Sequence, residues 1–168
     1  ATVLSYEVFC KIADVFDYLG NGIDHSTITG MAAVVGAGRL MGLAPEQMVQ
    51  AIGITTGGNT ATRQGRSDAL SNWKALAAAD ACRKAIFAVE LAQEGMTGPG
   101  KVFEGTYGFF KVIGKRPVEP PQLGEPFGIR RLHQALSARP VLADRGTSRH
   151  GSAVVRHEPG RHPRGQHP

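Results

Sequence analysis

The chain has 168 residues, of which 42% are hydrophobic and 20% are charged. This length and composition fit one globular domain with a buried core and exclude a chain that stays unfolded throughout. No segment reaches the ~20 consecutive apolar residues of a membrane-spanning helix, so we expect no membrane partner. The formal net charge of +5 comes from residues 130–168, with 8 Arg against two acidic residues, whereas residues 1–129 have 11 Lys and Arg against 12 Asp and Glu.

The N-terminus and the cysteines indicate the compartment. The first residues lack a basic segment followed by an apolar one, so we expect no secretion signal and a cytoplasmic protein. Cys10 and Cys82 match neither a CxxC motif nor a Cys/His metal spacing, which predicts two buried thiols and no metal site.

Two helices are predicted in the first quarter of the chain. The first covers residues 3–19, where apolar side chains recur every three or four positions: Leu4, Val8, Ile12, Val15, Phe16 and Leu19. The second is capped by Ser26 or Thr27, runs to residue 41 and is rich in glycine and alanine. Glycine inside a helix costs roughly 1 kcal/mol relative to alanine, so these residues predict close helix packing. A dinucleotide fingerprint is excluded because the glycine spacing is GxGxxxG and no strand precedes it.

Two further helices enclose a polar loop. Residues 45–54 predict a third helix, since Pro45 suits its first position and Glu46 its first turn. Residues 55–68 predict a loop whose length suggests a function. An alanine-rich helix then covers residues 71–94 and ends at Gly95. Its first residues fit S-x-x-K, which we treat as coincidence because the companion motifs of serine–lysine enzymes are missing.

The remaining residues change in character. Val102-Phe103 and Phe109-Phe110 predict short apolar anchors after a Gly98-Pro99-Gly100 turn. Residues 1–114 thus form one helical domain, residues 115–129 a Pro-rich link, and residues 130–168 an irregular or disordered tail rich in Arg, His and Pro. The tail also fits out-of-frame translation of a GC-rich gene. A nucleic-acid-binding arm is the least favoured reading because the tail has no Lys and no aromatic residue, and its histidines match no closed metal site.

A cluster of cations suggests a binding site. Arg63 and Arg66 lie in the polar loop, and Lys74 lies in the first turn of the helix that follows. A helix N-terminus favours negative charge, and a guanidinium can hold a carboxylate through two parallel hydrogen bonds. The cluster therefore predicts a site for a small polycarboxylate. The alternative is a solvated basic loop followed by a surface helix.

Three blocks of sequence resemble the MmgE/PrpD family. They are GIDHSTITGMAAVVGAGRLMGLAPEQMVQAIGI, then TRQGRSDALSNWKALAAADACRKAIFAVELAQEGMTGP, then FEGTYGFF, in the family's order. The family includes 2-methylcitrate dehydratase, cis-aconitate decarboxylase and iminodisuccinate epimerase, and the second block is nearest to the dehydratases. The resemblance implies a large all-α domain, of which this chain matches the later helices, together with a smaller α/β lid. It also implies a homodimer, and neither metal nor another cofactor.

The resemblance also implies roles for four residues. The family's active-site histidine falls on His25 and its active-site lysine on Lys74, while Arg63 and Arg66 match arginines of dehydratase-like members. The implied activity is metal-independent dehydration of a hydroxy-tricarboxylate such as 2-methylcitrate. A decarboxylase-like or epimerase member, and an inactive structural fragment that lacks the family's N-terminal helices and lid, are the alternatives.

These residue types fit the chemistry of dehydration. A proton must leave carbon next to a carboxylate while hydroxide is expelled, and fixed cations can stabilise the charge that develops. Arg63 and Arg66 can hold carboxylates, and Lys74 can stabilise an enediolate-like transition state. His25 has a reference pKa of ~6.5 and can move the proton. The alternative for His25 is a structural histidine that caps a helix or lies in the core.

Overall fold

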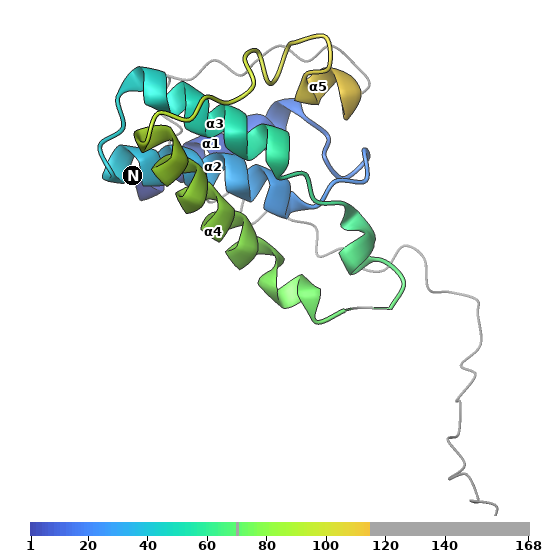
Figure 1. Ribbon diagram of the computed structural model, residues 1–168. Helices are drawn as coiled ribbons and strands as arrows, with labels where there is room; N and C mark the ends of the chain where they lie inside the picture. Colours follow the sequence, from blue (N-terminus) through green and yellow to red (C-terminus); the bar gives the residue numbers. More distant parts are fainter. Residues whose placement is uncertain (70, 115–168) are drawn as a thin grey trace, which may run out of the picture.

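The computed structural model describes residues 1–69 and 71–114 (Figure 1). The helical elements of this part are α1 (Thr2–Val15), α2 (His25–Leu40), α3 (Pro45–Gly58), the 3-10 turn η1 (Arg63–Arg66), α4 (Trp73–Gln93) and α5 (Phe109–Val112). These residues contain no strand, so the prediction of a mainly α-helical bundle is confirmed. None of these helices is long and apolar enough to cross a membrane. The predicted link and tail lie outside the described residues.

Helix α2 is the centre of the bundle, because α1, α3 and α4 all pack against it (Figure 1). Its first half contributes Ile28 and Met31 to a core shared with α1 and α5, and its second half contributes Val34 to a core shared with α3 and α4. Helices α2 and α4 both begin at the end of the bundle where η1 lies (Figure 1). The predicted site residues therefore lie toward one end of the molecule.

Two glycines of α2 face side chains of α3 and of the residue that follows it at short range. A Cβ added at Gly30 would lie 2.6 Å from Asn59 Nδ2, and one added at Gly38 would lie 2.7 Å from Met48 Cε. Real Cβ atoms do not come this close to a neighbour. Both neighbouring atoms are the ends of flexible side chains, so an added Cβ at either position would require only that side chain to shift.

Two helix boundaries near the start of the chain differ from the prediction. Helix α1 ends at Val15 rather than residue 19, because Phe16 is extended (φ −123°, ψ 109°) and turns its ring into the core. The ring contacts those of Phe109 and Phe110, with centroids 5.2 and 5.8 Å away. Burial of the Phe16 ring thus ends the helix earlier than the apolar periodicity predicted. The same contacts confirm Phe109-Phe110 as an apolar anchor.

The boundaries around the polar loop also differ. Helix α3 continues to Gly58 instead of ending at residue 54, since Thr55 and Thr56 are each only 3% exposed and pack into the bundle. Helix α4 begins at Trp73 rather than residue 71. Its other end agrees with the prediction: Gly95 has φ +87°, and the N–H of Met96 donates to the carbonyl of Leu91 at 2.9 Å.

The segment after α4 crosses α3 so closely that Gly98 has no room for a side chain. A Cβ at Gly98 would lie 2.6 Å from the carbonyl oxygen of Gln50 and 2.7 Å from the backbone nitrogen of Ile54. We expect Gly98→Ala to lower the free energy of unfolding by about 1–3 kcal/mol, because the backbone of α3 must shift. Urea denaturation of Gly100→Ala, where nothing lies within 4 Å, is the matched control. Equal losses in both variants would contradict the expectation.

Candidate functional site

A short backbone pairing brings the arginine-containing turn to the start of α2. Ile23 and Thr62 form an isolated antiparallel bridge. The N–H of Asp24 donates to the carbonyl of Ala61 at 2.9 Å, and the N–H of Ala61 donates to Thr27 Oγ1 at 2.8 Å. Residues almost forty positions apart are thereby held together. The pairing places η1 directly beside the first turn of α2.

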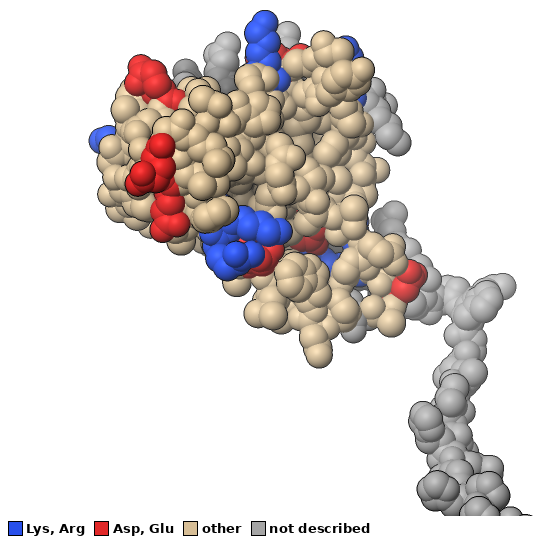
Figure 2. Space-filling model, viewed as in Figure 1, with Lys and Arg blue, Asp and Glu red and all other residues tan. Residues whose placement is uncertain are grey.

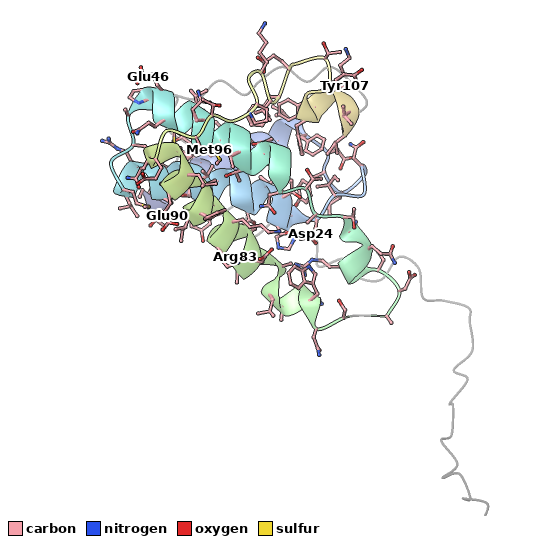
Figure 3. The ribbon with its side chains drawn as sticks, viewed as in Figure 1. Asp24, Glu46, Arg83, Glu90, Met96 and Tyr107 are labelled. Atoms are coloured by element: carbon pink, nitrogen blue, oxygen red, sulfur yellow. The ribbon has the colours of Figure 1, made fainter. Side chains whose placement is uncertain are left out.

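Asp24 lies where η1 meets the start of α2 (Figure 3). It is 4% exposed, and its Oδ1 accepts a hydrogen bond from the N–H of Ser26 at 2.9 Å. The same oxygen lies 3.4 Å from His25 Nδ1, and Oδ2 accepts a short hydrogen bond from Arg66 Nε. Asp24 therefore caps α2, which corrects the prediction that Ser26 or Thr27 caps it. Asp24 was not among the predicted site residues, although an Asp just before a helix is a recognisable capping signal.

The surroundings of Asp24 favour its ionised form. Burial alone raises the pKa of this carboxyl group. The hydrogen bond from Arg66, those from Ser26 and the charge of His25 together outweigh burial, so the pKa is lower than its ordinary value. Asp24 is therefore a buried anion at neutral pH that is compensated by neighbouring donors.

The lowered pKa predicts an acid-dependent contribution to stability. A carboxyl group whose pKa is lower in the folded state than in the unfolded state stabilises the folded protein at pH values above its unfolded pKa, about 3.9. This stabilisation is lost as the pH falls through the pKa of the folded state. We expect Asp24→Ser to lower the free energy of unfolding by about 1–3 kcal/mol at pH 7 and by less at pH 3. Serine retains a helix cap, so the difference reports the lost charge. Urea denaturation at both pH values measures it, and a loss that does not depend on pH would contradict the assignment.

His25 is the first residue of α2 and lies at a groove between α1, α2 and α4. Its side chain is 27% exposed. The groove has a volume of about 550 Å³ and is mainly apolar. It is lined by Ala1, Thr2, Ser5, Tyr6, Phe9, Cys10, His25, Thr29, Ala32, Ala33, Gly36, Ala37, Leu40, Cys82 and Ile86. The imidazole thus has an apolar hollow on one side and the carboxylate of Asp24 near its Nδ1.

Lys74 and Arg66 share a second hollow. Lys74 is the second residue of α4 and is exposed. It lines an open pocket of about 560 Å³ together with Arg66, Ser71, Asn72, Ala75 and Leu76. Two fixed cations at one pocket can attract an anion with more than one carboxylate.

The four predicted residues are therefore only partly brought together. Arg66 and Lys74 line one pocket, while His25 lines a different hollow and is connected to Arg66 through Asp24. The side chain of Arg63 does not line either hollow, and its backbone N–H donates to the carbonyl of Gly22 at 2.8 Å. The site is thus a series of neighbouring groups rather than a single cavity.

The described residues offer no clear metal site. Across residues 1–69 and 71–114, no three His, Cys, Asp or Glu side chains lie close enough together to hold a metal ion. Cys10 and Cys82 are both free thiols that line the groove beside His25. Cys10 is buried as predicted, whereas Cys82 is only partly buried because it faces the open groove. Burial and the nearby Asp14 raise the pKa of the Cys10 thiol, so it stays protonated at neutral pH.

Comparison with known families identifies the chain. A family model, the MmgE/PrpD N-terminal domain, matches residues 1–120. This range includes every helix described above, together with the pairing of η1 with the start of α2. The three sequence blocks that resemble the family all lie inside the matched range. The chain therefore belongs to the MmgE/PrpD family, which includes the 2-methylcitrate dehydratases.

Proposed function

We propose that this chain carries part of the active site of a metal-independent lyase that dehydrates a small hydroxy-tricarboxylate such as 2-methylcitrate. One observation carries the proposal: the buried carboxylate of Asp24 contacts both a candidate proton carrier, His25, and a candidate carboxylate-binding group, Arg66. The pocket that Arg66 shares with Lys74 supplies a second cation. Membership of the MmgE/PrpD family fits this activity.

The cations hold the substrate in this proposal. Arg66 uses Nε for Asp24, which leaves its two terminal nitrogens to donate to a substrate carboxylate. Lys74 contributes a charge at the same pocket, and Arg63 adds a third cation to the same turn. A tricarboxylate carries enough negative charge to engage several of these groups at once.

His25 moves the proton in the reaction. Its imidazole takes the proton from the carbon next to a substrate carboxylate, and the electrons of that C–H bond form the double bond as the C–O bond breaks. The departing hydroxide takes this proton from the His25 imidazolium and leaves as water, which returns His25 to its neutral form. Lys74 and Arg66 stabilise the negative charge that builds up on the carboxylate during proton removal. The apolar groove beside His25 suits an alkyl substituent such as the methyl group of 2-methylcitrate.

An absorbance assay tests the proposal. The purified chain is given 2-methylcitrate or citrate, and the conjugated double bond of an unsaturated tricarboxylate is followed in the near ultraviolet. Release of carbon dioxide from cis-aconitate would instead support a decarboxylase-like member, and interconversion of stereoisomers without a new absorbance would support an epimerase. Absence of all three activities would contradict a catalytic role for this chain.

A second candidate function is structural, and the exposed apolar residues favour it. Several large apolar side chains on α4 and at the end of α2 face solvent. Figure 2 shows charged side chains in separate clusters on one face, with uncharged residues between them. Their exposed fractions are 77% for Leu40, 58% for Leu76 and 56% for Phe87. Such a surface is typical of a segment that associates with another chain. We propose a second copy as that chain, which matches the homodimer expected for the family.

Sedimentation equilibrium distinguishes this structural role. We expect the chain to form a dimer that Phe87→Ser weakens by about tenfold in dissociation constant, since burial of one large apolar side chain contributes about 1.5–3 kcal/mol. Val49→Ser is the matched control, because Val49 is 63% exposed on α3 rather than α4. A monomer at all concentrations, or equal effects of both substitutions, would contradict self-association through α4.

A further inference from the structure

The groove beside His25 follows the whole length of α2. The residues of α2 that line it recur every three or four positions, from His25, the first residue of the helix, to Leu40, the last. Residues with this spacing share one face of a helix. At a rise of 1.5 Å per residue, the face is roughly 22 Å long. The other lining residues come from α1, including its N-cap residue, and from α4, which both pack against α2. The groove is therefore a long hollow over α2 that begins at His25.

The lining of the groove suits an apolar group and not an ionic one. Among the described residues that line it, none is Asp, Glu, Lys or Arg. A carboxylate placed along the groove would lose hydration without gaining a charged partner. The middle of the α2 face consists of small residues, which leave the space above the helix open: Ala32, Ala33, Gly36 and Ala37.

The groove is much larger than a methyl group. Its volume is about 550 Å³, whereas an apolar cavity of about 150 Å³ already holds benzene, a ring of six carbon atoms. A methyl substituent of a substrate at His25 would occupy only the end of the groove near that residue. The size and length of the groove therefore favour a substrate whose apolar part is several carbon atoms long.

We infer that the groove holds a linear alkyl chain of the substrate, and that the preferred substrates are 2-alkylcitrates with chains longer than methyl. This inference rests on the proposed dehydration and names its substrate class. In a 2-alkylcitrate, the carbon that carries the alkyl chain also carries a hydrogen and a carboxylate. A base at His25 that removes this hydrogen places the start of the chain at the end of the groove. The carboxylates face the other way, since Arg66, paired with Asp24 next to His25, lines the pocket of Lys74.

The exposed apolar side chains at the groove agree with this occupant. Tyr6, Ile86 and Leu40 all line the groove and are 45%, 47% and 77% exposed. An alkyl chain lying along α2 would remove part of each side chain from water, and binding gains in proportion to the apolar area buried. Because the groove is open on one side, we expect each added methylene to raise the affinity about twofold, whereas complete burial would give about fourfold.

Isothermal titration calorimetry with tricarballylates that carry a methyl, butyl or octyl chain tests the inference. These compounds lack the hydroxyl group that dehydration expels, so binding is measured without turnover. With the full chain, we expect the dissociation constant to fall about eightfold from methyl to butyl and about 15-fold further from butyl to octyl.

A variant that blocks the groove locates the chain. Ala33 lines the groove eight residues after His25, roughly 12 Å along the helix. We expect Ala33→Phe to leave the binding of the methyl and butyl compounds within about twofold and to abolish the gain from butyl to octyl. Ala79→Phe adds the same ring at an exposed position of α4 that lines neither hollow, and we expect it to keep that gain.

The results separate this inference from the proposed function. If the unsubstituted protein binds the octyl compound no more tightly than the methyl one, the inference is overturned, and this result needs no variant. A groove covered by a second copy of the chain would give that result. Equal loss of the octyl gain in Ala33→Phe and Ala79→Phe also overturns it. A chain-length effect without dehydration of any 2-alkylcitrate contradicts the proposed function alone, whereas dehydration without a chain-length effect contradicts this inference alone.

Discussion

Replacing His25 with asparagine is expected to lower the turnover of 2-methylcitrate by about 100-fold or more, the usual contribution of a general base or acid. Asparagine keeps a polar group of similar size at the first position of α2, but it cannot take up and release a proton near neutral pH. The loss should therefore appear in kcat more than in KM. Initial rates measured by absorbance over a range of substrate concentrations separate the two constants.

Cys82→Ala is a suitable control for that experiment. Cys82 lines the same groove as His25 but lies on α4, and we assign it no part in the reaction. We expect its replacement to leave turnover within about twofold of the unsubstituted protein, because loss of a half-buried thiol is a small packing change. If His25→Asn turned over substrate as fast as Cys82→Ala, His25 would be a structural histidine at the start of α2.

Much of the fold could be predicted from local patterns. Apolar periodicity placed the first helix, glycine and alanine in the second indicated close packing, and Gly95 marked the end of α4. Each of these signals acts within a few residues of chain. The prediction failed where tertiary contacts overruled local preference: Phe16 leaves α1 to join the core, and the buried Thr55 extends α3 into an apparent loop.

The site was harder to predict because it depends on a pairing between distant segments. The resemblance pointed to His25, Lys74, Arg63 and Arg66, but no local signal joins residues 23 and 62. Asp24 gains its importance only when η1 reaches the start of α2. The predicted residues also do not share one cavity, since His25 and Lys74 line separate hollows and Arg66, which lines the hollow of Lys74, is paired with Asp24 next to His25.

The second large effect is expected for Arg66→Ala. We expect KM for a tricarboxylate to rise by about 10–100-fold, because a charged hydrogen bond to the substrate contributes about 1.5–3 kcal/mol. The free energy of unfolding should also fall, by about 3 kcal/mol, since the carboxylate of Asp24 stays buried without its guanidinium partner. Arg63→Ala removes the same charge from the same turn without breaking the pair of Asp24 and Arg66. We therefore expect a smaller rise in KM and a smaller fall in the free energy of unfolding than for Arg66→Ala.

A double substitution separates the two roles of Arg66. In Asp24→Ser combined with Arg66→Ala, no buried anion is left without a partner, so stability should recover relative to Arg66→Ala alone. The rise in KM should persist, because the donor that holds the substrate carboxylate is still missing. Urea denaturation and steady-state rates on the four proteins of this cycle measure both quantities. If the double variant regained affinity together with stability, Arg66 would act only by holding Asp24, and the substrate carboxylate would have to be held by Lys74.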